Sequence, residues 1–371
     1  MKKLTQRKKQ HLLKLAKYRL ENIHKKKKAL AIKKKEFKRL KEMYKLKEIV
    51  TLVVPEHFNI VSRNLRSELL HFISRLRTYT LKKSTLVYLD FKKTTMMGAE
   101  ATLYFLAELE TILNANKCLK FKIIFSKNDI VNQVLYQTGI LRLLKVNITV
   151  DSSLFDESVK CWAYASGENA QVTSEARGIV KDLGQLFTES VQYTRGWFKV
   201  ITEAMTNCHH HAYLEPRFID SPNSPSLKKW WLFSKEVDGV LTVCICDLGV
   251  GIPRSLKSYS PETNPSWLKR VQNYVKELRK IYNEDSALIK AAIEIGKTRT
   301  NLPNRGKGLS QIINELGKLP NADVSVSILS NTGGFKTKKL QLTDSILIPF
   351  NDSIHGTIIT WQVSTLPSGF D

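Results

Sequence analysis

The sequence predicts an α/β and α+β protein in which a basic helix precedes a small α/β domain and a larger α/β sandwich. Three observations favour this fold class: the start is Lys-rich and lacks Gly and Pro, strand and helix patterns alternate over 49–150, and Gly-containing motifs follow in the C-terminal half. A chain of 371 residues is long enough for two domains with their own cores. We therefore expect an arm at 1–48, a domain at 49–150, a linker at 151–170 and a second domain at 171–371.

The arm carries most of the positive charge. Residues 1–48 contain 20 Lys or Arg and 4 Glu, a balance of +16, so the rest of the chain carries +9 of the net +25. Strong helix formers predict a helix, with one narrow apolar seam at Ala16, Ile23, Leu30, Phe37 and Tyr44. The second seam position is mostly lysine, at Lys27, Lys34 and Lys41, so a stable two-stranded coiled coil is not expected.

Two interpretations of this arm remain open. A Lys-rich helix binds phosphate backbones without reading bases, which predicts salt-dependent contact of residues 1–48 with nucleic acid. Alternatively, the arm is a solvated tail that aids solubility or touches acidic partners. A membrane-surface role is disfavoured because the apolar face is thin.

Strand and helix patterns alternate in the next unit. Strands are expected at 49–54, 85–91 and 121–125, and helices at 64–78, 98–113 and 129–144. This alternation predicts a small sheet with helices packed on it. The polar stretch at 151–170 is the expected linker, with a short strand at 160–165.

A first candidate motif lies on a predicted helix at 188–212. Glu203, Asn207 and His211 are spaced by four residues and would lie on one helix face. An Asn oxygen suits Mg²⁺, which keeps waters and bridges phosphates, and a Glu one turn earlier would orient or deprotonate an attacking water. The histidines at 209–211 point about 100° apart, so they would not close a zinc shell.

A second motif follows a predicted buried strand at 240–245. Asp247 would stand at the end of this strand, where its carboxylate would accept a hydrogen bond from an exocyclic amine. Gly249 and Gly251 precede Ile252 and allow a ligand to approach the backbone closely.

The third motif consists of Arg305, Gly306, Lys307, Gly308 and Leu309. It opens a predicted helix at 309–316, whose N-terminal N–H groups and dipole would favour an anion such as a triphosphate. Lys307 would add a positive charge.

The order of these motifs resembles the Bergerat-fold superfamily of histidine-kinase-like (GHKL) ATPases, over about residues 170–365. The resemblance implies that Glu203 is the general base, Asn207 the Mg²⁺ ligand and Asp247 the residue that reads adenine. The other nucleotide-binding residues that it implies are His211, Gly249, Gly251, Ile252, Arg305, Gly306, Lys307, Gly308, Leu309 and Thr357. Thr357 opens a terminal strand at 358–363 and is expected near the Asp247 carboxylate.

The spacer between the second and third motifs, residues 254–304, is long and contains a predicted helix at 267–281. By the same resemblance it is expected to form the lid over the nucleotide, and residues 291–300 resemble a bacterial lid signature. The classical phosphate-binding loop of P-loop proteins, Gly-x-x-x-x-Gly-Lys-Ser/Thr, does not occur.

The stretch from Leu86 to the helix after Gly98 faintly resembles the sulfate-transporter and anti-sigma-antagonist (STAS) domain. In that family a phosphorylatable Ser precedes the glycine, whereas Met96 and Met97 occupy those places here. The resemblance then implies a docking or sensing domain that engages a protein partner.

These features together predict a Mg²⁺-dependent ATP-binding protein, a slow ATPase acting as a conformational switch on a protein or nucleic-acid partner. The alternative is an anti-sigma-type serine/threonine protein kinase that uses the same ATP site. A non-hydrolysing scaffold is disfavoured because Glu203 and Asn207 are both present, and a histidine kinase because no phospho-acceptor helix pair precedes the domain.

No apolar run reaches about 18 residues and the N-terminus lacks the apolar stretch of a signal peptide, so no membrane association is expected. Five cysteines without Cys-x-x-Cys spacing favour a reducing cytoplasm. The sequence leaves open whether two copies form a homodimer on ATP, as many GHKL proteins do.

Overall fold

The computed structural model describes residues 6–44, 46–82, 84–160, 162–168, 191–221, 224, 226–258, 265–295, 308–318, 322–337 and 345–365. Over these residues the protein is a mixture of helices with parallel and antiparallel sheets. None of the helices in these ranges is both long enough and apolar enough to cross a membrane.

The N-terminal unit is built on a three-stranded parallel sheet. Its strands are β1 (Glu48–Val53), β3 (Thr85–Asp90) and β5 (Lys120–Ile124), in the order β1-β3-β5. Crossover helices α2 (Arg63–Arg77) and α3 (Ala99–Ala115) join them, and β2 (His57–Phe58) pairs with β4 (Met96–Met97). The predicted alternation of strand and helix is confirmed to within a few residues.

The helix predicted at 129–144 is instead two helices, α4 (Asp129–Gln137) and α5 (Ile140–Leu143). Between them Gly139 adopts φ +78°, a left-handed conformation that glycine takes without steric cost. The single-helix prediction was wrong because apolar periodicity continues across the glycine while the backbone turns.

The C-terminal unit is a seven-stranded antiparallel sheet in the order β11-β10-β9-β12-β8-β7-β6. Its strands are β6 (Ala163–Gly167), β7 (Trp230–Val237), β8 (Val240–Asp247), β9 (Ala322–Ser330), β10 (Gly333–Thr337), β11 (Ile346–Pro349) and β12 (Thr357–Thr365).

The segment predicted as a linker, 151–170, belongs in part to this sheet. It contains a short 3₁₀ turn (Ser152–Leu154), α6 (Glu157–Lys160) and the edge strand β6, which pairs with β7. Phe155, Val159 and Trp162 are buried in the core. The linker prediction does not hold for these residues, because their few apolar side chains pack although the surrounding composition is polar.

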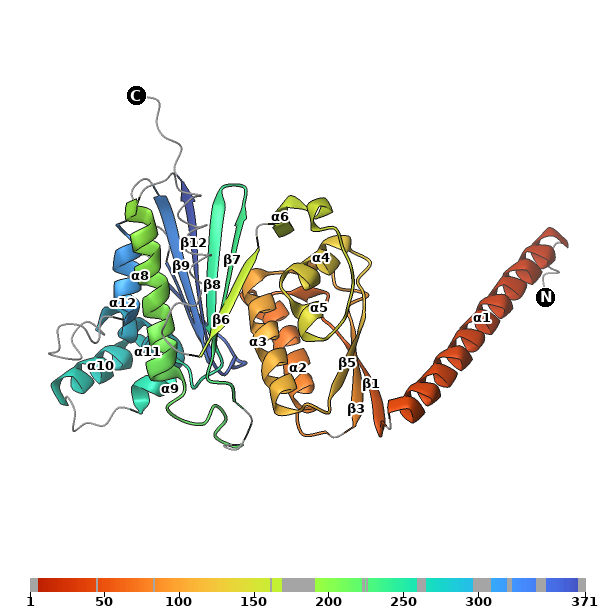
Figure 1. The fold of residues 1–371 in the computed structure, drawn as a ribbon, viewed down its shortest axis with the longest axis horizontal. Coiled ribbons are helices and arrows are strands. Elements are labelled where there is room, and N and C mark those ends of the chain that lie inside the picture. Colours follow the sequence, from red (N-terminus) through yellow and green to blue (C-terminus); the bar gives the residue numbers. More distant parts are fainter. Residues whose placement is uncertain are drawn as a thin grey trace, which may run out of the picture.

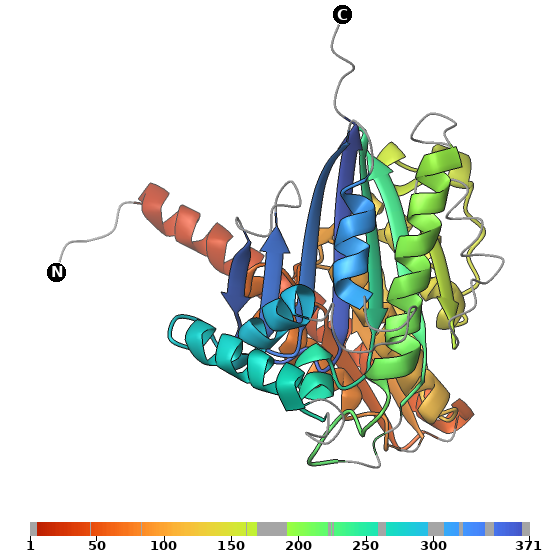
Figure 2. The same cartoon turned by 90° about the vertical axis from the view of Figure 1, so that its left-hand side faces the viewer.

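One face of the large sheet carries the C-terminal helices, as Figure 2 shows. They are α8 (Val191–Asn207), α9 (Ile252–Lys257), α10 (Pro265–Leu278), α11 (Glu284–Glu294) and α12 (Gly308–Leu316). The helix α12 packs along α8, with Ile312 and Leu316 in the same buried cluster as Ile201 and Met205. This packing fixes the helix that carries Glu203 and Asn207 against the sheet.

The opposite face of the large sheet packs against the N-terminal unit (Figure 1). Helix α3 contacts β7, β8 and β12, so α2 and α3 lie between the two sheets. Twelve of the 17 residues of α3 are buried, which explains why its sequence is apolar on all sides rather than amphipathic. One continuous core joins Phe105 of α3 with Trp231, Cys244 and Ile358 of the large sheet.

Helix α1 (Gln6–Tyr44) extends away from both units (Figure 1). Its contacts lie near its C-terminal end, where Leu40 packs with Leu46 and Leu86 and the Phe37 ring stacks on Tyr88 at 5.6 Å. The prediction of a helical arm is confirmed.

Candidate functional site

Three polar side chains meet at one end of neighbouring strands of the large sheet. Asp247, the last residue of β8, lies opposite Thr357 of β12, which in turn lies opposite Ser330 of β9. The Thr357 side chain hydrogen-bonds the Asp247 carboxylate, and its hydroxyl lies 3.2 Å from Ser330 Oγ. The expected proximity of Thr357 to Asp247 is therefore confirmed.

The Asp247 carboxylate is buried, with a 6% exposed surface. Burial raises its pKa to about 6, although hydrogen bonds from Gly249, Cys208 and Thr357 and the charge of Arg217 act in the opposite direction. The Gly249 N–H donates to Oδ1 at 2.9 Å and Cys208 Sγ lies 3.7 Å from Oδ2. At neutral pH the side chain is thus an ionised acceptor in a nearly dry environment.

The turn after Asp247 is held between two other segments. Val250 N donates to Ala212 O at 2.7 Å, and Asn331 Nδ2 donates to Val250 O at 3.0 Å. A Cβ atom on Gly249 would lie 2.1 Å from Ala212 O, and one on Gly251, at φ +80°, would lie 2.6 Å from Asn331 Oδ1. The sequence interpretation assigned both glycines to ligand approach, whereas the structure also gives each a close protein neighbour.

Helix α8 carries the first motif as far as Asn207. Residues Cys208–Ala212 then form a π-helical turn, which places the Cys208 thiol beside Asp247. The prediction that α-helical spacing continues to His211 is wrong, because a π turn winds through more residues than an α turn. His211 is half-buried on this turn.

Two side chains on α8 have unusual environments. Asn207 Nδ2 is buried and has no hydrogen-bond partner among the described residues, a costly arrangement that calls for an explanation. Glu203 lies one turn earlier and is half-buried, and this burial raises its pKa. A carboxylate with a raised pKa is a better proton acceptor than an exposed one.

The third motif is described only from its second half. Arg305, Gly306 and Lys307 lie outside the described residues, Gly308 is the first residue of α12, and Leu309 is half-buried against the core. The helix predicted at 309–316 is present as α12.

The described part of the spacer at 254–304 includes the last residues of α9 and the whole of α10 and α11. Asn283 Nδ2 donates to Thr332 O at 2.7 Å, and Asp285 Oδ2 accepts from Thr332 N at 3.0 Å, which bonds the start of α11 to the turn between β9 and β10. The expectation that the whole spacer forms a lid is therefore wrong for α11. Residues 296–304, which include part of the expected lid signature, lie outside the described residues.

The residues present fit a magnesium-bound nucleotide. Mg²⁺ is commonly held by one or two protein oxygens together with substrate phosphates and water, and the Asn207 side chain carries one such oxygen. The buried Nδ2 of Asn207, unpaired among the described residues, is a donor, so it would suit a phosphate oxygen rather than the metal. The buried acceptor Asp247 fits an amine donor such as that of adenine. The fold holds both side chains, Asn207 and Asp247, in place.

Several residues of this site were missed by the sequence interpretation. Ser330 accepts from Ile252 N at 2.9 Å and donates to Gly356 O at 3.0 Å. Asn331 contacts the turn after Asp247, and Cys208 contacts the Asp247 carboxylate. These residues reach the site through strand register and the π turn. No spacing in the sequence indicates them.

Two series of contacts connect the site with the N-terminal unit. In the first, Arg254 Nη1 donates to Arg217 O at 2.7 Å, and the Arg217 guanidinium pairs with the buried Glu108 of α3. In the second, Arg66 of α2 donates to Asn331 O at 3.0 Å, and Asn331 holds the glycine turn.

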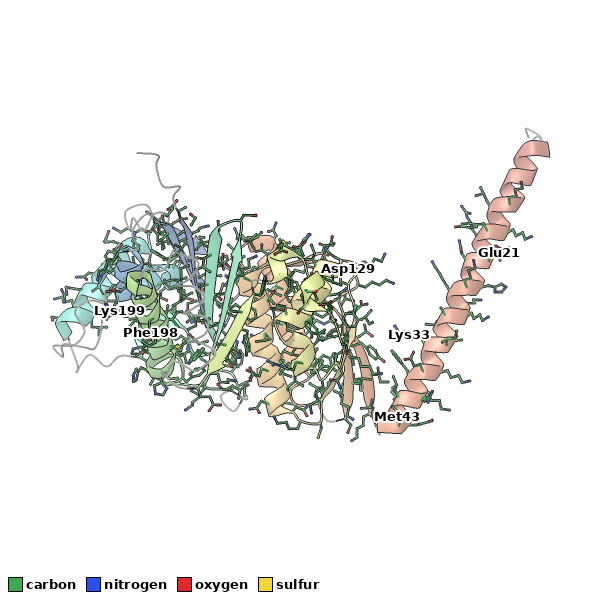
Figure 3. The ribbon with its side chains drawn as sticks, turned by 45° about the horizontal axis from the view of Figure 1, so that its top comes forward. Glu21, Lys33, Met43, Asp129, Phe198 and Lys199 are labelled. Carbon is green, nitrogen blue, oxygen red and sulfur yellow. The ribbon has the colours of Figure 1, made fainter. Side chains whose placement is uncertain are left out.

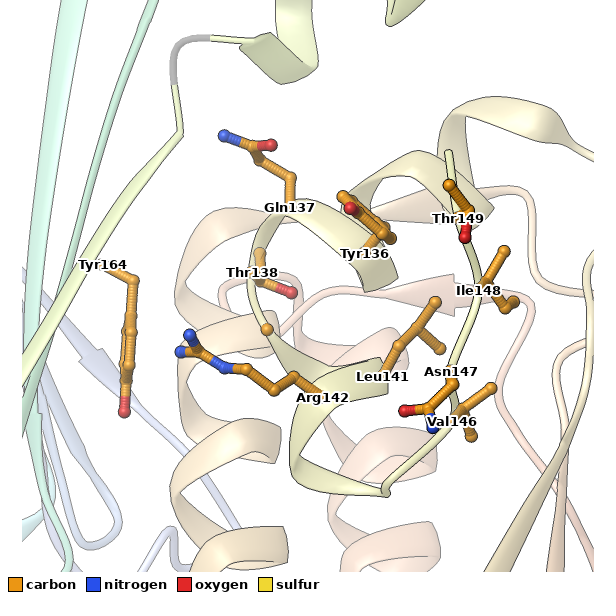
Figure 4. A pocket seen from close by; sticks show the side chains of 11 residues that line it. Tyr136, Gln137, Thr138, Leu141, Arg142, Val146, Asn147, Ile148, Thr149 and Tyr164 are labelled. Carbon is orange, nitrogen blue, oxygen red and sulfur yellow. The ribbon is translucent and has the colours of Figure 1, made fainter. Parts of the chain in front are cut away.

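A cavity of about 600 Å³ lies elsewhere, between the segment from α4 to residue 149 and β6 (Figure 4). Its lining residues are Tyr136, Gln137, Thr138, Gly139, Leu141, Arg142, Val146, Asn147, Ile148, Thr149 and Tyr164. They include no carboxylate and none of the predicted site residues. We therefore base the functional assignment on Asp247 and α8 rather than on this cavity.

Comparison of the chain with protein-family models and with curated proteins finds no match. The assignment of function thus depends on the residues and their geometry.

Proposed function

We propose that the C-terminal unit is a Bergerat-type nucleotide-binding domain that binds ATP with Mg²⁺ and hydrolyses it slowly. The observation that carries the proposal is the convergence of Asp247, Thr357 and the end of α8 at one place. The motifs that hold them are far apart in the sequence, so their meeting was not implied by any one of them.

Each residue has a separate part in this proposal. Asp247, held by Thr357 and Gly249, accepts a hydrogen bond from the exocyclic amine of adenine. Asn207 provides an oxygen to Mg²⁺, and Glu203 takes a proton from the attacking water. The bound Mg²⁺ would supply charge neutralisation at the phosphates.

We further propose that nucleotide occupancy acts as a switch on the N-terminal, STAS-like unit. The glycine turn contacts Asn331, which accepts from Arg66 of α2. A nucleotide that displaces this turn would therefore change contacts made by α2. A ligand shifts the equilibrium between two conformations only when it contacts them differently, and the displaced turn would provide that difference. The protein partner of this unit would sense the change.

The test uses the full chain with ATP and Mg²⁺, and measures binding by calorimetry and phosphate release. Asp247→Asn should abolish nucleotide binding. Glu203→Ala should retain binding and lower turnover about 10²–10⁴-fold, the usual contribution of a general base. The matched control is Glu68→Ala on the exposed side of α2, which should change neither.

Equal turnover by the wild type and the Glu203 variant would refute the assigned base. Transfer of the terminal phosphate to a Ser or Thr of another polypeptide would instead support the kinase alternative. Unchanged binding by the Asp247 variant would refute the nucleotide site itself.

A further inference from the structure

Helix α1 is positively charged around its whole circumference. Its 39 residues include 16 Lys or Arg and three Glu, a net charge of +13. The consecutive lysines at 25–28 point in four directions about 100° apart, and all four are exposed. Figure 3 shows side chains projecting from this helix on more than one side, with Glu21, Lys33 and Met43 labelled along it.

The fold supplies no counter-charge to this helix where its side chains are described, from 14 to 43 except 16. None of the ion pairs among the described side chains includes an α1 residue. Like charges also stand three or four residues apart, as in Lys14 and Lys17, Lys25 and Lys28, or Lys34 and Lys38. Each such pair destabilises a helix by about 0.2–0.5 kcal/mol, so a polyanion that surrounds the helix would stabilise it.

The distribution of apolar residues argues against a lipid surface. A helix that lies on a membrane needs its apolar residues on one face. Ile23 and Ile32 are nine residues apart, so they point in opposite directions, and both are exposed, at 48% and 61%. An acidic protein surface would likewise contact only one side of the helix, and the positive charges on its other sides would remain without a partner.

A duplex nucleic acid matches this all-round charge. Its major groove is about 12 Å wide and is flanked by two phosphate strands, while an α-helix with side chains is about 10–12 Å across. A helix inside the groove therefore places lysines and arginines from two of its sides near the two phosphate strands. The contacts of Phe37 and Leu40 at the base of α1 connect such a helix with the N-terminal unit.

We propose that α1 is a binding arm for duplex DNA that contacts the phosphate backbone independently of base sequence. This proposal does not depend on the proposed ATP site. It commits α1 to one of the two interpretations that the sequence left open.

The test measures binding of the full chain to a 30-base-pair DNA duplex of mixed sequence by fluorescence anisotropy, from 50 to 200 mM salt. In the test variant, Lys25→Gln, Lys26→Gln, Lys27→Gln and Lys28→Gln are combined. If the arm enters a groove, two to four of these lysines meet phosphates. The slope of log K against log salt should then become less negative by roughly 2 to 4, with about tenfold or more loss of affinity at 100 mM.

A second quadruple variant is the matched control, with the same change in net charge on exposed lysines of the body: Lys93→Gln, Lys117→Gln, Lys127→Gln and Lys228→Gln. It should keep the wild-type slope. Gln and Lys have similar helix propensities, and circular dichroism should show that both variants retain the wild-type helix content.

Three outcomes would overturn the proposal. They are an equal loss of affinity in both variants, absence of duplex binding by the wild type, and binding of the wild type to phosphatidylserine-containing vesicles as tight as to DNA. Weak vesicle binding together with a slope change confined to the α1 variant would support it.

Discussion

At the residue scale, the ionised Asp247 carboxylate lowers the stability of the ligand-free protein. Its pKa in the folded protein is raised to about 6, above the 3.8 of an aspartate side chain in water. A carboxyl group with a raised pKa destabilises the folded state when it ionises, so its contribution becomes unfavourable as pH rises from about 4 to 6. This shift, in which the hydrogen bonds that Asp247 accepts are already included, corresponds to about 3 kcal/mol.

We therefore predict that Asp247→Asn does not lower the stability of the ligand-free protein at pH 7, although it abolishes nucleotide binding. The melting temperature of the variant minus that of the wild type should be larger at pH 7 than at pH 4.5. At pH 4.5 the wild-type carboxyl group is largely protonated. Differential scanning calorimetry at both pH values checks this. A variant that is less stable at pH 7 than the wild type would contradict the assigned cost of the charge.

The same carboxylate predicts a pH dependence of binding. Adenosine, which lacks titrating phosphates, should bind about tenfold more weakly at pH 5 than at pH 7, because protonation of Asp247 competes with the amine. Ligand-observed NMR titrations measure this ratio. A pH-independent affinity would show that Asp247 does not contact the base.

Gly249 is required for the close packing of the turn after Asp247 against Ala212. Gly249→Ala would place Cβ against the Ala212 carbonyl, a backbone atom that cannot move cheaply. We expect a loss of about 1–3 kcal/mol or more in the free energy of unfolding, as for other overpacked sites. The control is Gly239→Ala, where φ is +70° but no atom lies within 4 Å, so only backbone strain of about 1–2 kcal/mol is added. Urea unfolding measures both, and a smaller loss at Gly249 would contradict the clash.

At the scale of elements, α1 and α3 differ most in their environment. Isolated helices are marginally stable in water and gain most of their stability from packing. The described side chains of α1 are nearly all exposed, whereas α3 is buried between two sheets.

We predict that amide exchange in α1 occurs through local opening that costs less than about 2 kcal/mol, while α3 exchanges near the global unfolding free energy of about 5–15 kcal/mol. Hydrogen-exchange mass spectrometry of the full chain provides the comparison. Equal protection of the two helices would mean that α1 has tertiary support that its described contacts do not supply. Added duplex DNA should protect α1 and leave α3 unchanged.

Elements were also the scale at which sequence patterns were most informative. Sequence patterns predicted α2 and α12 from the regular spacing of their apolar residues, and α3 and β8 from nearly continuous apolar runs that are buried on both sides. They missed the break at Gly139 and the π turn at 208–212, where neighbouring segments determine the backbone path.

At the scale of the whole molecule, a buried charge cluster joins the two units. Glu108 of α3 is 1% exposed and accepts from Arg77 Nη2 at 2.6 Å and from the Arg217 guanidinium. Tyr104 donates to Ile354 O at 2.6 Å and lies beside the same cluster. Burial would raise the pKa of Glu108, but the two arginines lower it well below its usual range.

We predict that Glu108→Gln lowers the free energy of unfolding by about 3–5 kcal/mol, because it leaves the buried Arg217 and the half-buried Arg77 without their counter-charge. Denaturant unfolding at pH 7 measures the loss. The control Glu277→Gln removes an exposed pair with Lys280 and should change stability by less than about 0.5 kcal/mol.

Because the pKa of Glu108 is depressed, its stabilisation is present above the unfolded pKa of about 4.5 and is lost as pH falls further. The difference between the wild type and the Glu108 variant should therefore shrink below pH 4.5. A constant difference down to pH 3 would contradict the charge cluster as its cause.

The sequence by itself determined the helical arm, most strands and helices, and the end of the strand that carries Asp247. It could do so because local periodicity, glycine turns and charge runs act over a few residues. The tertiary structure decided how Thr357, Ser330 and Cys208 reach Asp247, that β6 joins the large sheet, and that both units share one core. Those features depend on strand register and side-chain packing between segments up to hundreds of residues apart, which no local pattern encodes.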